Sequence, residues 1–364
     1  MRVAAAIDAT ALAHNFALVR KTAPGSRILA VVKADAYGHG VAKAAHALAA
    51  ADGFGVTSVD EALALRDVGV DTDIVVLEGA MDGGELDAAR HAKLDLVVHA
   101  KWQLEMLERD GVQGLTRLWI KFDTGMHRLG FPTEAAESVR TQLSALKIPE
   151  PVLMSHLACA DEPAREETAH QLEAFAHLRQ LFPGPASLAN SAGVLAHPTT
   201  HFDWVRPGLA LYGVSPFPGR GAATLGLRPA MTLISRLLAL QEVAAGEAVG
   251  YGGDWRAPRP SRIGIVSAGY GDGYPWRAEH SGVVLVRGRR APLAGRVSMD
   301  LLAVDLTQVP DARPGDAVTL WGEGLPVEQV AKIAGTTPYE LVCSVTRRVP
   351  RTYAEAERPA HAAA

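Results

Sequence analysis

Short apolar runs alternate with longer segments of helical periodicity between Arg27 and Val214. This alternation is typical of consecutive βα units, in which helices connect parallel strands. Segments such as Thr133–Leu146 and Arg165–Leu181 are predicted as helices. Eight strands are predicted: Ile28–Val32, Phe54–Thr57, Ile74–Leu77, Asp95–Val98, Leu118–Phe122, Val152–Ser155, Ala186–Ala189 and Ala210–Val214. Eight strands close a (β/α)8 barrel, and a doubly wound open sheet is the alternative fold.

The pattern changes after Pro216, where prolines and glycines form a turn-rich linker. Beyond Met231 the apolar runs are short and are separated by Gly and Pro, which is typical of a small antiparallel β domain. Strands are predicted there at Val283–Val286, Leu301–Leu306 and Ala317–Trp321. We therefore expect a barrel domain over residues 1–222 and a smaller, mainly β domain over residues 223–364.

Composition narrows the classes of partner. The 364 residues carry a formal net charge of −4, so no basic surplus is available to neutralise a nucleic acid or an anionic membrane. The apolar stretch before Asp8 is too short for a signal peptide, and we expect a cytoplasmic protein with a small-molecule partner. Cys159 and Cys343 lie far apart without a CxxC pair, so we expect buried free thiols and no metal site.

A lysine stands where the first predicted strand ends. Residues 30–40 read AVVKADAYGHG, which places Lys33 at the end of a barrel strand, on the face where such folds hold their active sites. A lysine amine there can bond covalently to an aldehyde cofactor, although a lone strand-end lysine is usually just a solvated charge. The run resembles the lysine signature of the alanine racemase family, whose cofactor is pyridoxal 5'-phosphate (PLP). The resemblance implies that Lys33 carries PLP and that Tyr37 reaches its phosphate.

The resemblance continues along nearly the whole chain. Residues 121–130 read KFDTGMHRLG and are similar to the family's second signature, in which Arg128 lies over the phenolic oxygen of the cofactor and helps to bind substrate. The lysine at the position of Lys121 is carbamylated in some relatives. His156, in the run MSHLA, corresponds to a histidine in the hydrogen-bond network behind the cofactor.

The last predicted strands supply the phosphate site that barrels often hold at this place. Asn190 and Ser191 follow strand seven, and residues 206–209 read RPGL before strand eight. The backbone N–H groups of Gly208 and Leu209, together with the Ser191 hydroxyl, are expected to bind the phosphate. The resemblance implies that Arg206 donates to the pyridine nitrogen, where most PLP enzymes use a carboxylate. A guanidinium keeps its proton, so the ring would be a restrained electron sink, which suits proton return without transamination.

Racemisation needs a proton removed from one face of Cα and delivered to the other, so a second acid or base must stand opposite Lys33. Residues 249–255 read VGYGGDW and resemble the family motif whose tyrosine has this role, which implies Tyr251. By resemblance, Tyr251 handles the proton of the L isomer and Lys33 that of the D isomer. Tyr270 and Arg296 correspond to residues of the substrate entrance, and the backbone N–H of Met299 to a donor for the substrate carboxylate.

The sequence departs from the family pattern at two positions. Arg347, in the run CSVTRRVPR, stands where relatives often carry a tyrosine that touches the phosphate and lines the inner gate. Its guanidinium could still pair with phosphate. Trp276 stands at an entrance position where some relatives have arginine. The polarity of the entrance therefore differs from the common pattern.

The resemblance implies a homodimeric isomerase that interconverts L-alanine and D-alanine with shared active sites. Alternatives are a racemase of another small amino acid such as serine, and a non-catalytic PLP-binding homeostasis protein. The residues beyond Met231 count against the homeostasis protein, which usually stops before any β domain. A basic amino-acid decarboxylase is disfavoured by Tyr251 and by the absence of its cysteine motif. A broad-specificity racemase would typically be exported, and no signal peptide is visible.

Overall fold

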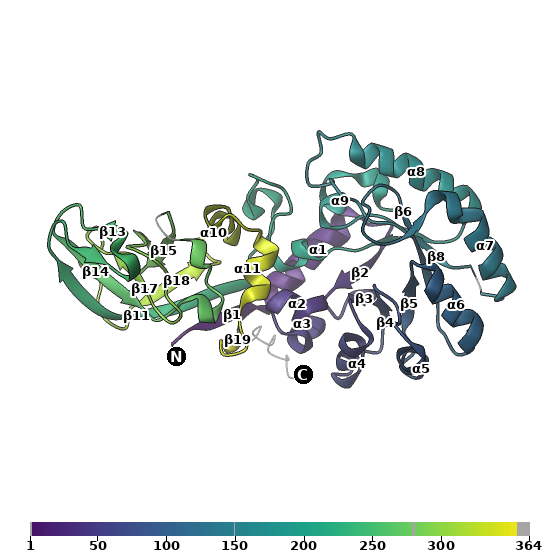
Figure 1. The fold of residues 1–364 in the computed structure, drawn as a ribbon, viewed down its shortest axis with the longest axis horizontal. Coiled ribbons are helices and arrows are strands. Elements are labelled where there is room, and N and C mark those ends of the chain that lie inside the picture. Colours follow the sequence, from purple (N-terminus) through teal and green to yellow (C-terminus); the bar gives the residue numbers. More distant parts are fainter. Residues whose placement is uncertain (1, 149, 279–280, 355–364) are drawn as a thin grey trace, which may run out of the picture.

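The computed structural model describes residues 2–148, 150–278 and 281–354, which form a barrel and a β domain joined side by side (Figure 1). Among these residues, eight parallel strands pair in a ring that closes through β5–β6 and β10–β2. The predicted (β/α)8 barrel is confirmed. In the order of pairing the strands are β2 (Arg27–Val31), β3 (Gly53–Val56), β4 (Asp73–Val76), β5 (Asp95–Val98), β6 (Leu118–Asp123), β8 (Val152–Met154), β9 (Ala186–Ser187) and β10 (Trp204–Val205).

The eighth strand is not where the apolar pattern placed it. Ala210–Val214 was predicted as a strand, but Leu209–Tyr212 forms the 3-10 helix η3, and the last barrel strand is the pair Trp204–Val205. The short apolar run is buried in either conformation, so periodicity could not separate strand from helix. Gly213, with φ 73°, ends the turn in a left-handed conformation that does not continue a strand.

Helices cover the outside of the barrel (Figure 1). Their apolar faces pack against the strands, and the predicted helices at residues 133–146 and 165–181 are confirmed as η1 (Thr133–Ala135) with α7, and as α8. The α-helices are α1 (Ala9–Thr22), α2 (Lys33–Gly38), α3 (Val41–Ala47), α4 (Val59–Asp67), α5 (Gly83–His91), α6 (Lys101–Asp110), α7 (Ala136–Ala145), α8 (Glu167–Leu181) and α9 (Ser191–Ala196). A short strand, β7 (Phe131–Pro132), pairs with the end of β6.

The barrel interior is filled by side chains from the strands, as expected for this fold. Trp119 and Trp204 are almost fully buried, and their rings lie 5.5 Å apart. The interior is therefore a packed core, and chemistry is confined to the end where the strand carboxyl ends meet the loops. The cluster consists of Leu29, Val75, Val97, Trp119, Val152, Met154 and Trp204.

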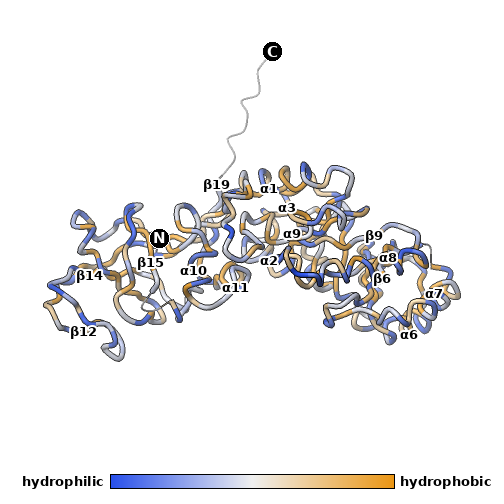
Figure 2. Tube along the Cα trace, turned by 90° about the horizontal axis from the view of Figure 1, so that it is seen from above, coloured by the Kyte–Doolittle hydropathy of each residue, from blue (hydrophilic) through white to orange (hydrophobic). Residues whose placement is uncertain are grey.

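The second part is the predicted β domain, with short helices at its junction with the barrel (Figure 1). Figure 2 shows the two parts from above, with hydrophobic and hydrophilic residues interleaved along the chain in both. The elements are β11 (Met231–Val243), β12 (Ala248–Val249), β13 (Trp255–Arg256), β14 (Ser261–Val266), β15 (Val283–Val286), β16 (Arg289–Pro292), β17 (Leu302–Asp305), β18 (Ala317–Trp321), α10 (Val327–Ala334), α11 (Pro338–Ser344) and β19 (Arg351–Ala354).

The chain begins in this second part. Strand β1 (Ala4–Asp8) pairs antiparallel with β11, in the register Ile7↔Met231, and parallel with β19. The division of the chain at residues 222/223 stays a prediction, to which the structure adds that β1 belongs to the sheet of the C-terminal part. Within the described ranges, no helix has both the length and the apolar character that crossing a membrane requires.

Candidate active site

Lys33 begins a turn with an unusual backbone. It follows β2 as the first residue of α2, and Ala34, Asp35, Ala36 and Tyr37 all have φ between 53° and 54°. Left-handed helical turns cost roughly 1–2 kcal/mol per residue for L-amino acids, so the surrounding structure must hold this segment in place. The turn fixes how Lys33 and Tyr37 project from the mouth of the barrel.

The carboxylate of Glu61 is one of the groups that hold the turn. Its Oε1 accepts a hydrogen bond from the backbone N–H of Ala34 at 2.7 Å, and its Oε2 accepts one from Thr57 at 2.7 Å. Glu61 lies in the first turn of α4, whose N-cap Ser58 receives the Glu61 N–H at 3.3 Å. The carboxylate of Glu61 thus ties the end of β2 to the end of β3.

The end of the barrel contains a cavity of about 650 Å³. Lys33, Lys121, Arg128 and Arg206 line it together, which gives it the charge to bind an anionic molecule. No group of three or more potential metal ligands is found in the part of the chain that the structure describes. The full lining is Val31, Lys33, Ala34, Tyr37, Leu77, Glu78, Lys121, Arg128, Leu129, Met154, His156, Asn190, Ser191, Arg206, Gly208, Leu209, Tyr339 and Cys343.

Arg206 is buried behind this cavity and held by neighbouring strands. Its Nη1 donates to Ser187 Oγ at 2.5 Å, and its Nη2 donates to the Ser155 carbonyl at 2.6 Å. Nη2 also lies 3.3 Å from His156 Nδ1, which must be the acceptor because a guanidinium nitrogen only donates. Burial lowers the pKa of Arg206 to about 9, so the group stays charged at neutral pH. Its Nε–H makes no hydrogen bond to the described residues and is available as a donor to a ligand.

Burial and charge repulsion lower the pKa values of His156 and Lys121, which line the cavity with Arg206. Burial, followed by the charges of Arg206 and Arg128, holds the pKa of His156 well below its ordinary value, so the imidazole is neutral. Burial, again followed by repulsion from Arg206 and Arg128, lowers the pKa of Lys121 to about 8. A buried lysine with a neutral amine fraction near physiological pH is the form that can take up carbon dioxide.

Asn190, Ser191 and Gly208 form another part of the cavity lining. Ser191 Oγ accepts the N–H of Gly208 at 2.9 Å and that of Ala210 at 3.2 Å, while Asn190 caps α9 by accepting the Gly193 N–H at 3.0 Å. A Cβ on Gly208 would lie 2.5 Å from Tyr37 Oη. Glycine at this position therefore leaves room for the tyrosine hydroxyl beside the backbone.

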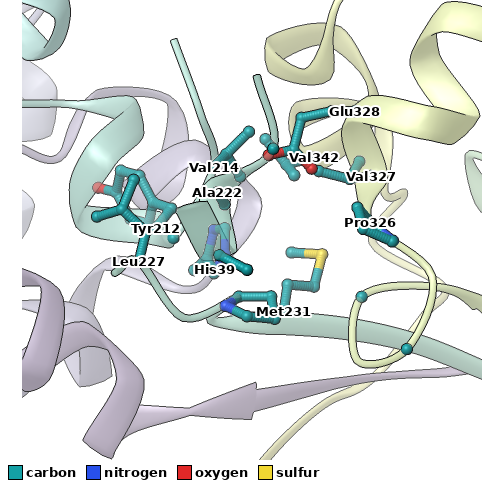
Figure 3. A pocket seen from close by; sticks show the side chains of 16 residues that line it. His39, Tyr212, Val214, Ala222, Leu227, Met231, Pro326, Val327, Glu328 and Val342 are labelled. Atoms are coloured by element: carbon teal, nitrogen blue, oxygen red, sulfur yellow. The ribbon is translucent and has the colours of Figure 1, made fainter. Parts of the chain in front are cut away.

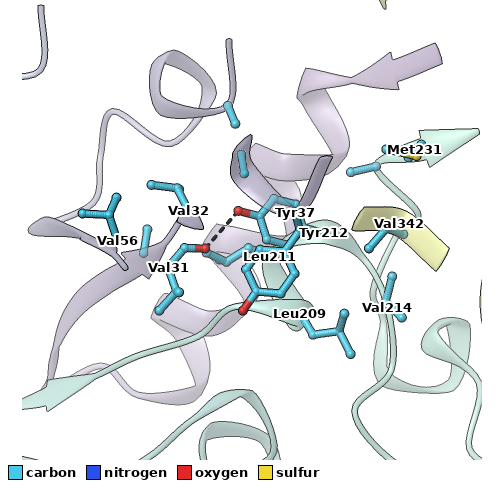
Figure 4. Packing of buried hydrophobic residues seen from close by; sticks show 14 of the residues in the cluster. Val31, Val32, Tyr37, Val56, Leu209, Leu211, Tyr212, Val214, Met231 and Val342 are labelled. Carbon is cyan, nitrogen blue, oxygen red and sulfur yellow. Dashed lines mark hydrogen bonds between the residues drawn. The ribbon is translucent and has the colours of Figure 1, made fainter. Parts of the chain in front are cut away.

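Tyr37 is positioned by a second tyrosine. Its ring stacks on Tyr212 with the centroids 4.7 Å apart, and Tyr212 Oη donates to the Val31 carbonyl at 2.9 Å (Figure 4). Burial raises the pKa of Tyr37, so its hydroxyl stays protonated and can donate to an anion. The geometry thus places a hydroxyl donor, Tyr37, beside Ser191 and Gly208.

The structure brings together all the residues predicted at the barrel end, but not those predicted in the β domain. Tyr251, Tyr270 and Met299 are 72%, 43% and 53% exposed, and none of them lines this cavity. Tyr251 lies in η5 (Tyr251–Gly253), just before β13 in the sequence, and Figure 1 shows β13 in the β domain, away from α2. Arg296 pairs with Asp254 in the same region at 2.5 Å.

Arg347 is also outside the cavity lining, so its predicted contact with phosphate stays a prediction. Sequence reasoning missed Glu61, Leu77, Glu78 and Tyr339. Leu77 and Glu78 directly follow β4, and their strand-end position could have indicated them. The expectation of buried thiols was wrong, because Cys159 is half-buried and Cys343 is exposed at the cavity. The pattern around Cys343 resembles a buried helix face, but α11 turns this residue toward the open mouth.

Two family models match the chain: the alanine racemase N-terminal domain over residues 7–216 and the alanine racemase C-terminal domain over residues 230–353. The chain belongs to the alanine racemase family. Membership of this family agrees with the lysine turn of α2 and with the cationic end of the barrel. The matches cover both parts of the fold described above.

Individual relatives extend over nearly the full chain. The biosynthetic alanine racemase of Pseudomonas aeruginosa is 49% identical over 351 residues, which is 96% of this chain and 98% of the relative. An alanine racemase of Nitrosococcus oceani is 48% identical with the same coverage. The crystal structure of the Pseudomonas aeruginosa biosynthetic racemase superimposes with a TM-score of 0.95 and covers 97% of this chain and 99% of that one.

A further member of the alanine racemase family bears on the cofactor. The alanine racemase of Bartonella henselae was solved with covalently bound pyridoxal phosphate. It is 30% identical to this chain, covers 97% of it and 100% of its own length, and has a TM-score of 0.88.

Proposed function

We propose that the chain interconverts L-alanine and D-alanine with PLP as cofactor, as a homodimer in which each barrel is completed by the partner's β domain. The observation that carries the proposal is the cavity at the barrel end. It holds a lysine amine, a charged arginine with a free Nε–H, and the hydroxyls of Ser191 and Tyr37 on either side of Gly208.

These groups fit the three polar parts of PLP. Lys33 would bond to the aldehyde carbon, Arg206 would donate to the pyridine nitrogen, and the hydroxyls of Tyr37 and Ser191 with the Leu209 N–H would hold the phosphate. The fit rests on the chemistry of the donors and on the space that Gly208 leaves beside Tyr37 Oη. PLP supplies the electron sink that makes the Cα proton of an amino acid removable.

The protein residues then have distinct tasks. Lys33 takes or returns a proton on one face of Cα, and Tyr251 does so on the opposite face. Because Arg206 stays charged and is fixed by Ser187 and the Ser155 carbonyl, it limits how much negative charge the ring accepts. Arg128 and the Met299 backbone N–H orient the substrate carboxylate. Tyr270 and Arg296 narrow the entrance.

The exposure of Tyr251 supports the shared site. A hydroxyl that is exposed and does not line the cavity of its own chain is free to complete the cavity of another copy, as in a two-fold dimer. The name of the biosynthetic relative supports a role in supplying D-alanine for cell-wall precursors, which we adopt as part of the proposal. A cytoplasmic location, with neither a nucleic acid nor a membrane as partner, stays a prediction.

Chiral analysis of the products formed from single L-amino acids tests the activity. We expect D-alanine from L-alanine, with L-serine converted far more slowly. Borohydride reduction followed by peptide mapping tests the lysine, and the pyridoxyl group is expected on Lys33. Its recovery on another lysine would contradict the assignment.

Complementation tests the shared site. Lys33→Ala and Tyr251→Phe should each lose racemisation by several orders of magnitude, while Tyr251→Phe keeps its PLP. When the two variants are refolded together, random pairing makes about half of the dimers hybrid, and each hybrid has one intact site. Activity should return to about a quarter of the wild-type value. Verified hybrids without activity would exclude a site shared between chains.

A further inference from the structure

A separate cavity of about 330 Å³ lies at the junction of the barrel and the β domain (Figure 3). It borders the cofactor cavity through the stacked pair of Tyr212, which lines the junction cavity, and Tyr37, which lines the other. We call it the junction cavity. Its lining is His39, Tyr212, Gly213, Val214, Gly221, Ala222, Ala223, Leu227, Pro229, Met231, Gly322, Gly324, Pro326, Val327, Glu328 and Val342.

His39 is the distinctive polar residue of this lining. It is fully buried, and its Nδ1 lies 2.9 Å from the Tyr37 carbonyl and 3.0 Å from the Ala36 carbonyl. A carbonyl oxygen only accepts hydrogen bonds, so Nδ1 must carry the proton. Burial lowers the pKa of His39 to about 4, which keeps the imidazole neutral. Its Nε2 is consequently an unprotonated acceptor.

This acceptor has no hydrogen-bond partner among the described residues. Buried polar atoms are almost always paired, because an unpaired one has lost its hydrogen bonds to water without replacement. Figure 3 shows the ring of His39 among the lining side chains, next to Met231. Nε2 is itself buried, so a donor in the cavity reaches it only when a neighbouring side chain moves, and the flexible thioether chain of Met231 lines the same cavity.

The lining also defines what kind of molecule fits. Glu328 is the one residue of the lining with a full charge, and its Oε1 already accepts the Ser215 N–H at 2.9 Å. Phosphate and carboxylate groups would find no cation in this lining. A water molecule needs two to four polar partners to be held in a cavity, whereas apolar cavities of about 150 Å³ stay dry and bind benzene. An apolar ring with one donor group matches these conditions.

We propose that the junction cavity binds a small neutral molecule with an apolar body and a single hydroxyl donor, of which phenol is the simplest example. The hydroxyl donates to His39 Nε2, and the ring packs against Tyr212, Met231 and Val342. None of the residues that line the junction cavity also lines the cavity at the barrel end. The existence of this binding site can therefore be tested whatever the outcome for the proposed reaction.

The test compares phenol with toluene, which has the same size but no donor, by ligand-observed NMR titration of the PLP-loaded protein. Both probes should bind the wild type. His39→Asn keeps a donor near the position of Nδ1 but has no group that reaches the position of Nε2. In this variant the affinity of phenol relative to toluene should fall by about fivefold, the value of one hydrogen bond.

A second variant tests the location. Ala222→Leu fills the cavity from the barrel side, and it should weaken both probes at least tenfold, while the matched variant Ala164→Leu, at an exposed position outside the cavity, should bind them as the wild type does. Retained PLP absorbance and an unchanged melting temperature show that each variant has folded. An unchanged ratio of phenol to toluene in His39→Asn, or unweakened binding to Ala222→Leu, would overturn the proposal.

Discussion

Arg348 Nε donates a hydrogen bond to Asp272 Oδ1 at 2.8 Å, and the other oxygen of this buried carboxylate accepts one from Arg2 at 2.9 Å. Arg348 also donates to the Met299 carbonyl at 3.3 Å. Asp272 ends the 3-10 turn η6 (Tyr270–Asp272), so one carboxylate connects both loops that are proposed to face the partner's cavity. It acts as a positioning residue for Tyr270 and Met299.

Asp272→Asn removes the charge that holds this network. We expect the KM for alanine to rise roughly three- to tenfold with a smaller change in kcat, because the variant loosens substrate-orienting loops and leaves the proton-transferring groups in place. The control is Asp300→Asn, because Asp300 pairs with the same Arg348 at 2.9 Å but has a side chain that is 49% exposed. Exposed pairs contribute little, and its KM should stay near the wild-type value. Equal effects of the two variants would refute the positioning role.

Glu61→Ala removes the acceptor of the left-handed turn that carries Lys33. Hydrogen bonds to a charged group contribute about 1.5–3 kcal/mol, so the PLP affinity and the melting temperature of Glu61→Ala should both fall. Both values for Glu61→Gln should lie between those of Glu61→Ala and the wild type. Glu85 accepts the Met81 N–H at 2.8 Å in a similar turn before α5, away from the cavity lining. Glu85→Ala should lower the melting temperature alone. Spectroscopic PLP titration separates the two cases.

Gly208→Ala places a methyl group 2.5 Å from Tyr37 Oη. The ring of Tyr37 is stacked on Tyr212 and cannot move freely, so the phosphate end of the cavity must distort. We expect the dissociation constant of PLP to rise at least about tenfold, an effect of roughly 1.4 kcal/mol. Gly25→Ala is the control, since nothing lies within 4 Å of its added methyl group. Normal PLP binding by the Gly208 variant would show that Tyr37 is free to shift.

Asp95 is the first residue of β5, at the end of the barrel opposite the cavity, and its ionisation should make the stability of the fold depend on pH. Burial raises its pKa from 3.8 to about 6, although Trp119 Nε1 donates to it at 3.0 Å. Between pH 4 and 6 the folded protein therefore holds a proton that the unfolded chain has released, so stability falls as pH rises through this window. The decline is on the order of 2 kcal/mol. Asp95→Asn should flatten it, as measured by urea midpoints at pH 4 and pH 7. Parallel curves for variant and wild type would contradict the assignment.

The sequence was informative where chemistry follows strand ends. Lys33, Arg206 and Ser191 stand directly after apolar runs, and parallel strands bring such positions together. The β domain could also be predicted, from its short apolar runs separated by glycines and prolines. The eighth strand was misplaced because Trp204–Val205 is only two residues long, whereas the buried run of η3 has the length of a strand.

Other features follow from tertiary structure and leave no local pattern. The left-handed conformation of Ala34–Tyr37 contradicts the preferences of these residues, and it persists because Glu61 and the Tyr212 ring hold it. Tyr339 reaches the cavity at the barrel end from a helix that lies more than 300 residues after Lys33. The proposed role of Tyr251 depends on a dimer, whose contacts a single chain does not contain.

The pairing of β1 with β11 and β19 also sets the order in which the protein can form. Strand β1 leaves the ribosome first, yet its antiparallel neighbour follows more than 200 residues later, and its parallel neighbour is the last element described. One edge of β1 therefore carries unpaired backbone groups until β11 is made, and the other until β19 is made, while all the barrel strands have already been synthesised. The barrel can therefore assemble early, and the sheet that would meet the partner subunit is completed only with residues 351–354. A message truncated before the codon of Arg351 would thus yield a formed barrel joined to an unfinished sheet.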